Sequence, residues 1–91
     1  MPITQSMINK ASRLTCNIYS PNNGEQLVLS YMEGSNQISR AVVNIPQNNN
    51  WQSIELYHDE KLSSNLTTIR INLYLSDSTY CYIDNCNLQI Q

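Results

Sequence analysis

The chain has 91 residues, a formal net charge of −2 and 13% charged residues. The length limits the number of domains, and the charge limits the classes of partner. The length allows one domain and excludes a two-domain enzyme, because domains typically have about 100–150 residues. With five Lys and Arg residues and a pI near 5.0, the chain lacks the basic footprint of a nucleic-acid-binding domain. No apolar run approaches the roughly 18–20 residues of a membrane helix, so we expect no membrane insertion.

The composition favours strands and turns over helices. Asn, Gln, Ser and Thr together account for 36 of the 91 residues, and there are ten Ile and six Tyr residues but only two Ala residues. β-branched and aromatic residues favour strands, whereas Asn favours turns. We therefore expect an all-β chain with a neutral surface rich in amides and hydroxyls.

The first half of the chain predicts three strands, over residues 13–19, 25–32 and 38–45, because apolar side chains recur there at every second position. The Asn-Gly turn within residues 20–24 and a second turn at residues 33–36 separate them. The predicted inward side chains are Leu14, Cys16 and Ile18, then Leu27, Leu29 and Tyr31, then Ala41, Val43 and Ile45.

The second half predicts three more strands, over residues 51–57, 66–75 and 79–91. Their inward side chains are Ile54 and Leu56, then Ile69, Ile71, Leu73 and Leu75. In the last strand the apolar positions change from odd (Cys81, Ile83) to even (Cys86, Leu88, Ile90). One extra residue at Asp84 or Asn85 would reconcile them, which predicts a β-bulge with both cysteines toward the core.

Six short strands without intervening helices predict an antiparallel β-sandwich, jelly-roll-like, over residues 13–91. Residues 1–12 form an N-terminal arm. The spacing of Met7, Ala11 and Leu14 is consistent with a short helix or coiled-coil stub, and a frayed or strand-forming arm fits equally well.

The cysteines and the single histidine predict no disulfide framework and no zinc site. Three cysteines are an odd number, so we expect buried free thiols. His58 is the only histidine and a zinc site would need further ligands, so we expect a solvated loop at residues 58–60. Residues 1–4 lack the start of a secretory signal. We therefore expect synthesis in a reducing compartment, with the virion or a secreted larger protein as possible destinations, and we interpret the acceptor pattern at Asn65 as a chance match.

Three segments together resemble the jelly rolls of carbohydrate-binding modules with a galactose-binding-like fold. They are residues 27–34 (LVLSYMEG), residues 50–54 (NWQSI) and the closing strand at residues 82–88 (YIDNCNL), in the order of that family. The resemblance covers residues 13–91 and implies a β-sandwich that binds sugars without catalysis. The chain departs from the family because it is shorter and lacks the preceding strands.

The resemblance also implies a structural calcium held in part by the acidic residue of the closing strand, here Asp84. The N-terminal partner motif is absent, and calcium needs about six or more oxygen ligands. The alternative is an Asp that bonds nearby backbone amides. We expect no other cofactor.

The chain is also similar in character to the trimeric C-terminal modules of phage tail fibres, appendages and lysins. This similarity implies an assembly function, in which a homo-oligomer such as a trimer covers exposed strand edges. We therefore expect a glycan as the partner, a second copy of the chain, or both.

The outward positions of the last three strands predict one surface rich in rings and planar polar groups. Sugars stack on such rings and take hydrogen bonds from amides and carboxylates. Subunit interfaces are also rich in Tyr, Trp and Arg, so the alternative is an assembly module that uses this aromatic face between subunits. The candidate binding residues are Trp51, Glu55, Tyr57, Arg70, Asn72, Tyr74, Tyr80 and Tyr82.

Two further interpretations concern the surroundings of that surface. Asn48, Asn49 and Asn50 are candidates for a site at the loop end, or for a simple turn. Glu55 and Asp84 are the carboxylates that a glycosidase would need, but nothing places them together, so we expect no enzyme.

Overall fold

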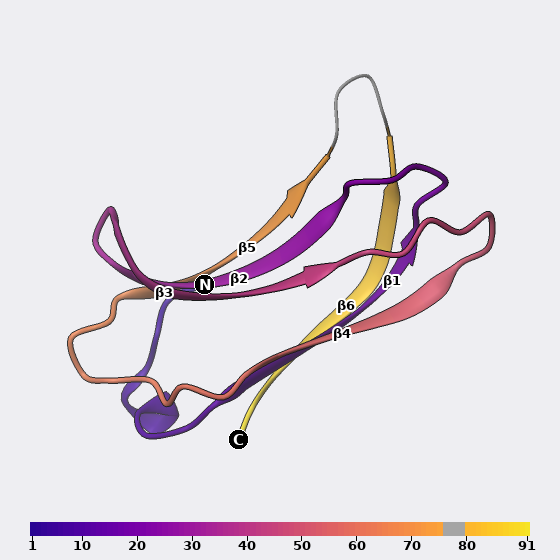
Figure 1. Ribbon diagram of the computed structural model, residues 1–91. Coiled ribbons are helices and arrows are strands. Elements are labelled where there is room, and N and C mark those ends of the chain that lie inside the picture. The colour runs from indigo at the N-terminus through magenta and orange to yellow at the C-terminus, as the bar shows by residue number, and fades with distance from the viewer. Residues whose placement is uncertain (76–79) are drawn as a thin grey trace.

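The computed structural model describes residues 1–75 and 80–91, which form an antiparallel β-sandwich of two three-stranded sheets (Figure 1). One sheet has the strand order β4-β1-β6, and the other has β3-β2-β5. The elements are η1 (Gln5–Met7), a 3-10 turn, and the strands β1 (Ser12–Tyr19), β2 (Gln26–Glu33), β3 (Asn36–Asn44), β4 (Gln52–His58), β5 (Thr68–Tyr74) and β6 (Tyr82–Ile90). The predicted fold class is confirmed.

The core lies between the sheets, where the period-2 patterns meet. Leu14, Cys16 and Ile18 of β1 are fully buried, as are the inward side chains of β2. Ile54 and Leu56 of β4 belong to the same cluster. Alternating apolar positions give β1 and β4 one buried face each, which fixes the register of these two strands.

Strand β2, the central strand of its sheet, is buried on both faces, whereas the outward residues of the equally central β1 are only half-buried. Val28, Ser30 and Met32 point away from the core, yet they are covered by the side chains of the flanking strands β3 and β5. The near-continuous apolar run of this strand thus matches its burial on both faces.

The predicted bulge in the last strand is confirmed. Thr15 pairs with Asn87 and Asn17 pairs with Asp84, so Cys16 alone faces two residues of β6. Asn85, one of those two, has a φ of 52°. Asn is one of the few residues that adopts this left-handed conformation readily.

A disulfide joins Cys16 to Cys86 across the bulge, with the Cα atoms 4.1 Å apart. The prediction of free thiols is therefore wrong for these two cysteines, and Cys86 is exposed rather than in the core. The reason is a long-range pairing between β1 and β6 that the odd cysteine count did not reveal. Cys81 is free and half-buried against the core.

His58 is the last residue of β4 and is buried, so the prediction of a solvated loop is wrong for it. Its ring stacks on Tyr31, and its Nε2 lies 3.1 Å from the Ser39 hydroxyl. The Tyr31 hydroxyl in turn shares a 2.7 Å hydrogen bond with the buried Ser12 hydroxyl. His58 continues the inward parity of Ile54 and Leu56, which explains its burial.

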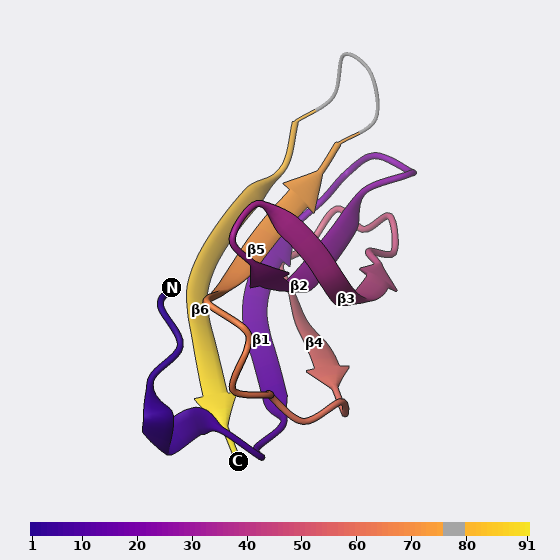
Figure 2. The same cartoon turned by 90° about the vertical axis from the view of Figure 1, so that its left-hand side faces the viewer.

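The N-terminal segment covers part of the β5 edge. Pro2 pairs with Thr68, and the Ile69 N–H donates to the Met1 carbonyl at 2.8 Å. Ala11 and Gln91 exchange two hydrogen bonds, so η1 and the C-terminus lie at the same end of the sandwich (Figure 2). Ile3 and Met7 pack against the core there.

One side of the sandwich is open between the edge strands β5 and β6. Three side chains predicted to face inward are exposed there, namely Ile71 (40%), Leu75 (46%) and Ile83 (42%). The prediction that the inward face of β5 is core holds for buried Ile69 and half-buried Leu73 but is wrong for Ile71 and Leu75. These positions are exposed because few side chains of the facing sheet lie opposite them, unlike Ile54 and Leu56 of the other edge strand β4, which are buried. We call Ile71, Leu75 and Ile83 the open side.

Candidate binding face

The outer face of the β4-β1-β6 sheet carries the side chains that alternate with the core positions. The β1 residues on this face are Arg13, Thr15, Asn17 and Tyr19. The register aligns Asn17 with Ser53 of β4 and with Asp84 of β6, and it aligns Tyr19 with Tyr82. Side chains from segments far apart in the sequence therefore form rows across three strands.

Four aromatic rings form a continuous row at one end of this face, which we call the ring row: Trp51, Tyr19, Tyr82 and Tyr80. The Tyr19 ring centroid lies 6.0 Å from that of Trp51 and 6.0 Å from that of Tyr82, and Tyr82 lies 5.5 Å from Tyr80. Trp51, Tyr82 and Tyr80 are 54%, 57% and 54% exposed, so ring surface remains open to a ligand.

Three of these rings are among the predicted candidates, but Tyr19 is not. Tyr19 is half-buried at the centre of the row and contacts both Trp51 and Tyr82. The signal for it was present, because Tyr19 has the parity opposite to Leu14, Cys16 and Ile18 and therefore points outward. The sequence did not reveal that β1 lies between β4 and β6.

Polar rows continue from the ring row along the same face. The first contains Ser53, Asn17 and Asp84, and the second contains Glu55, Thr15 and Asn87. Amide, hydroxyl and carboxylate groups thus lie beside the rings, and they can donate and accept hydrogen bonds. Asp84 Oδ1 accepts the Asn85 N–H at 2.8 Å, which keeps this carboxylate at the bulge.

The far end of the face carries its one described ion pair, in which Arg13 donates to Glu55 at 2.5 Å. Both side chains are exposed, and surface pairs of this kind contribute little to stability. Tyr57 pairs with Arg13 across the strands and is exposed there. Glu55 and Tyr57 therefore share the face with the ring row but lie further along it.

The expectation that all eight candidate residues share one surface is wrong. Arg70, Asn72 and Tyr74 pair with Ser30, Val28 and Gln26, so they lie on the outer face of the other sheet. Arg40 lies on that same face, because it pairs with Ser30 from the opposite side. Two stacked sheets expose opposite outer faces, and the sequence did not assign the last three strands to separate sheets.

The loop before β4 is held by hydrogen bonds at the edge of the ring row. The Asn48 N–H donates to the Ser20 carbonyl at 2.8 Å, and the Asn48 side chain accepts the Asn50 N–H at 3.0 Å. Gln52 donates to the Pro46 carbonyl at 2.7 Å. These contacts hold the segment that precedes Trp51, so the loop determines where the Trp51 ring lies.

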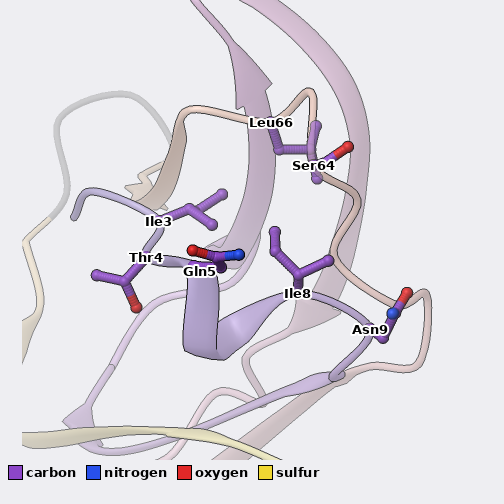
Figure 3. Close-up of a pocket in the computed structure, with 7 residues that line it drawn as sticks. All are labelled: Ile3, Thr4, Gln5, Ile8, Asn9, Ser64 and Leu66. Atoms are coloured by element: carbon purple, nitrogen blue, oxygen red, sulfur yellow. The ribbon is translucent and has the colours of Figure 1, made fainter.

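A separate hollow of about 580 Å³ lies at the other end of the sandwich (Figure 3). Figure 3 shows side chains of the N-terminal segment, Gln5 and Ile8 among them, across from Ser64 and Leu66. Its seven lining residues carry no charge and no aromatic ring: Ile3, Thr4, Gln5, Ile8, Asn9, Ser64 and Leu66. It offers shape and amide groups but no stacking surface.

The ionisable side chains of His58 and Glu25 are buried. Burial lowers the pKa of His58, and the nearby Glu60 and Asp59 carboxylates oppose this effect. Glu25 is fully buried, and neither of its carboxylate oxygens has a hydrogen-bond partner. Burial also raises the pKa of the Cys81 thiol, and the Glu25 carboxylate adds to the rise.

The described residues form no metal site. Within residues 1–75 and 80–91, no three His, Cys, Asp or Glu side chains are placed to hold a metal ion. A calcium at Asp84 stays a prediction, and the charge of the binding face is considered with the Asp84 carboxylate free of a bound ion.

Comparison with known proteins identifies no relative, since no family model, curated protein or solved structure matches the chain. None of the described helical segments is long and apolar enough to cross a membrane.

Proposed function

We propose that the protein is a non-catalytic carbohydrate-binding module that recognises a cell-wall or cell-surface glycan through the ring row. The observation that carries this proposal is the unbroken series of four rings, with neighbouring centroids 5.5–6.0 Å apart and three of the rings more than half exposed. Sugar C–H faces stack on aromatic rings, and sugar hydroxyls take hydrogen bonds from amides and carboxylates. Asn17, Ser53 and Asp84 supply such groups in the adjacent row.

The shape of the row favours a single glycan chain as the ligand. Neighbouring rings are inclined to each other by 47°, 35° and 61°, so they do not form one plane. A flexible chain can adjust to successive tilted rings, whereas a flat crystalline surface cannot contact all of them. The neutral hollow at the other end lacks rings and is the weaker candidate for a sugar site.

A glycan microarray followed by an NMR titration of the ¹⁵N-labelled protein tests this proposal. We expect saturable shifts at Trp51, Tyr19 and Tyr82 with the glycan that the array selects. The variant Tyr82→Ala should weaken binding about tenfold, since a stacking ring is lost. The matched control is Tyr74→Ala, because Tyr74 is a similarly exposed tyrosine (49%) on the opposite face.

Two outcomes would contradict the proposal. One is the absence of binding to every glycan on the array. The other is a glycan whose chemical-shift changes map to the Tyr74 face and are lost in Tyr74→Ala rather than in Tyr82→Ala.

The second candidate function is assembly with further copies of the same chain, and the open side favours it. Ile71, Leu75 and Ile83 expose apolar surface between two edge strands. Edge strands with free backbone groups pair readily with another chain. Such a homo-oligomer would also accommodate the trimer expected of a phage-fibre module, and it leaves the ring row free for a glycan.

Light scattering at several protein concentrations tests assembly. We expect Ile83→Asn to lower the oligomeric mass, whereas Ile38→Asn should not, because Ile38 is at least as exposed but lies on β3, away from the open side. A wild-type protein that stays monomeric at all concentrations would contradict assembly and leave glycan binding untouched.

A further inference from the structure

We infer that the ring row selects neutral glycans and rejects anionic ones, because Asp84 lies beside it and no cation does. This inference rests on the proposed function and specifies its class of ligand. Asp84 aligns with Asn17, in the row next to Tyr19 and Tyr82. It is exposed, and the one ion pair among the described residues joins Arg13 to Glu55 and does not involve Asp84.

The five Lys and Arg residues of the whole chain all lie elsewhere. Lys10 and Lys61 are near the start of β1, where the Leu62 N–H donates to the Lys10 carbonyl. The eight-residue strand β1 separates them from Tyr19 by roughly 20 Å or more, at about 3.3 Å per residue. Salt screens charges beyond about 8 Å at physiological ionic strength.

The three arginines do not compensate for Asp84 either. Arg13 is four residues before Asn17, the β1 residue that pairs with Asp84, which places it roughly 13 Å from Asp84 along the face, and it is paired with Glu55. Arg40 and Arg70 lie on the outer face of the other sheet. Residues 76–79 contain no Lys or Arg in the sequence.

A negative group on a sugar bound to the ring row therefore meets an uncompensated carboxylate. Two like charges about 4 Å apart repel strongly enough to weaken binding about fivefold even at the dielectric constant of water, and more at a partly dry surface. Sulfate, uronate and sialate groups all fall in this class. Neutral hydroxyls and acetamido groups meet no such penalty, and they can donate hydrogen bonds to Asp84.

The test is a glycan microarray in which each core is printed in a neutral form and in a sulfated, uronate or sialylated form. Wild-type protein should bind the neutral form at least fivefold more tightly. Asp84→Asn should reduce this ratio to less than twofold, and the Asn side-chain oxygen can still accept the Asn85 N–H. The matched control is Asp59→Asn, which removes the same charge from the loop after β4 and should leave the ratio unchanged.

Three outcomes separate this inference from the proposal beneath it. Acidic glycans bound as tightly as their neutral forms would overturn the inference alone. An unchanged ratio in Asp84→Asn would also overturn it, because the selectivity would have another source. Absence of binding to every printed glycan would overturn the proposed function and the inference together.

Discussion

The His58 ring stacks on the Tyr31 ring inside the sandwich, with centroids 4.1 Å apart and planes inclined by 3°. The stack joins the end of β4 to the centre of the other sheet. It is extended by the hydrogen bond between His58 Nε2 and the Ser39 hydroxyl and by that between the Tyr31 and Ser12 hydroxyls. The chain's one histidine is thus a structural element that responds to pH.

Acidification below the ordinary histidine pKa should destabilise the protein. Burial lowers the pKa of His58 in the folded state, so the unfolded chain takes up the proton more readily. Stability is therefore full above about pH 6.5 and falls as pH drops below that value, by at most about 1.4 kcal/mol per pH unit. Urea unfolding at pH 7.5 and pH 5.5 measures the difference.

The matched variant for this effect is His58→Phe, which keeps an aromatic ring on Tyr31 but cannot titrate. Its free energy of unfolding should change much less between the two pH values. An equal loss in the variant and the wild type would assign the pH dependence to other groups.

Loss of the Tyr31 hydroxyl should destabilise the core. Tyr31→Phe leaves the buried Ser12 hydroxyl without its 2.7 Å partner, and an unsatisfied buried hydroxyl costs about 1–3 kcal/mol. The double variant Tyr31→Phe with Ser12→Ala removes both groups and should recover part of that loss. Urea unfolding of the two variants checks this, and a single variant as stable as the wild type would contradict it.

Reduction of the Cys16–Cys86 disulfide should lower the free energy of unfolding by about 2–5 kcal/mol, because the bond closes a long loop between residues 70 positions apart. Urea unfolding with and without a reducing agent measures this. Cys81→Ser is the control and should remain sensitive to the reductant, since Cys81 is not bonded. Three free thiols in the non-reduced protein would show that the bond is absent.

The alternation of apolar residues predicted the six strands. Which of their inward side chains are buried depends on strand pairing between distant parts of the chain. The alternation in residues 13–19 and 51–57 specified the buried faces of β1 and β4 because both strands pack directly against the other sheet. The change from odd to even apolar positions near Asp84 predicted the bulge, because one extra residue there returns both sets of positions to the same face. Ile71 and Leu75 have an inward pattern too, but they are exposed because they border the open side between β5 and β6, whereas the other edge strand β4 is covered by the facing sheet.

The candidate site was predicted in part for a related reason. Trp51, Tyr80 and Tyr82 were expected on one face, and that face also holds Tyr19, whose contacts depend on β1 lying between β4 and β6. Arg70, Asn72 and Tyr74 were assigned to the same face although their strand belongs to the other sheet. Strand order across a sandwich depends on contacts far apart in the sequence, which periodicity does not encode.

Trp51 offers the most direct measurement of glycan binding at the ring row, because it is the single tryptophan of the chain and is 54% exposed. A glycan that stacks on the row removes water from this ring, so its fluorescence emission should shift to shorter wavelength and saturate with ligand. The shift should persist in Tyr74→Ala with the wild-type affinity. In Tyr82→Ala, the affinity obtained from the titration should be about tenfold weaker. A glycan that binds the protein, as shown by calorimetry, without any change in Trp51 emission would contradict the account.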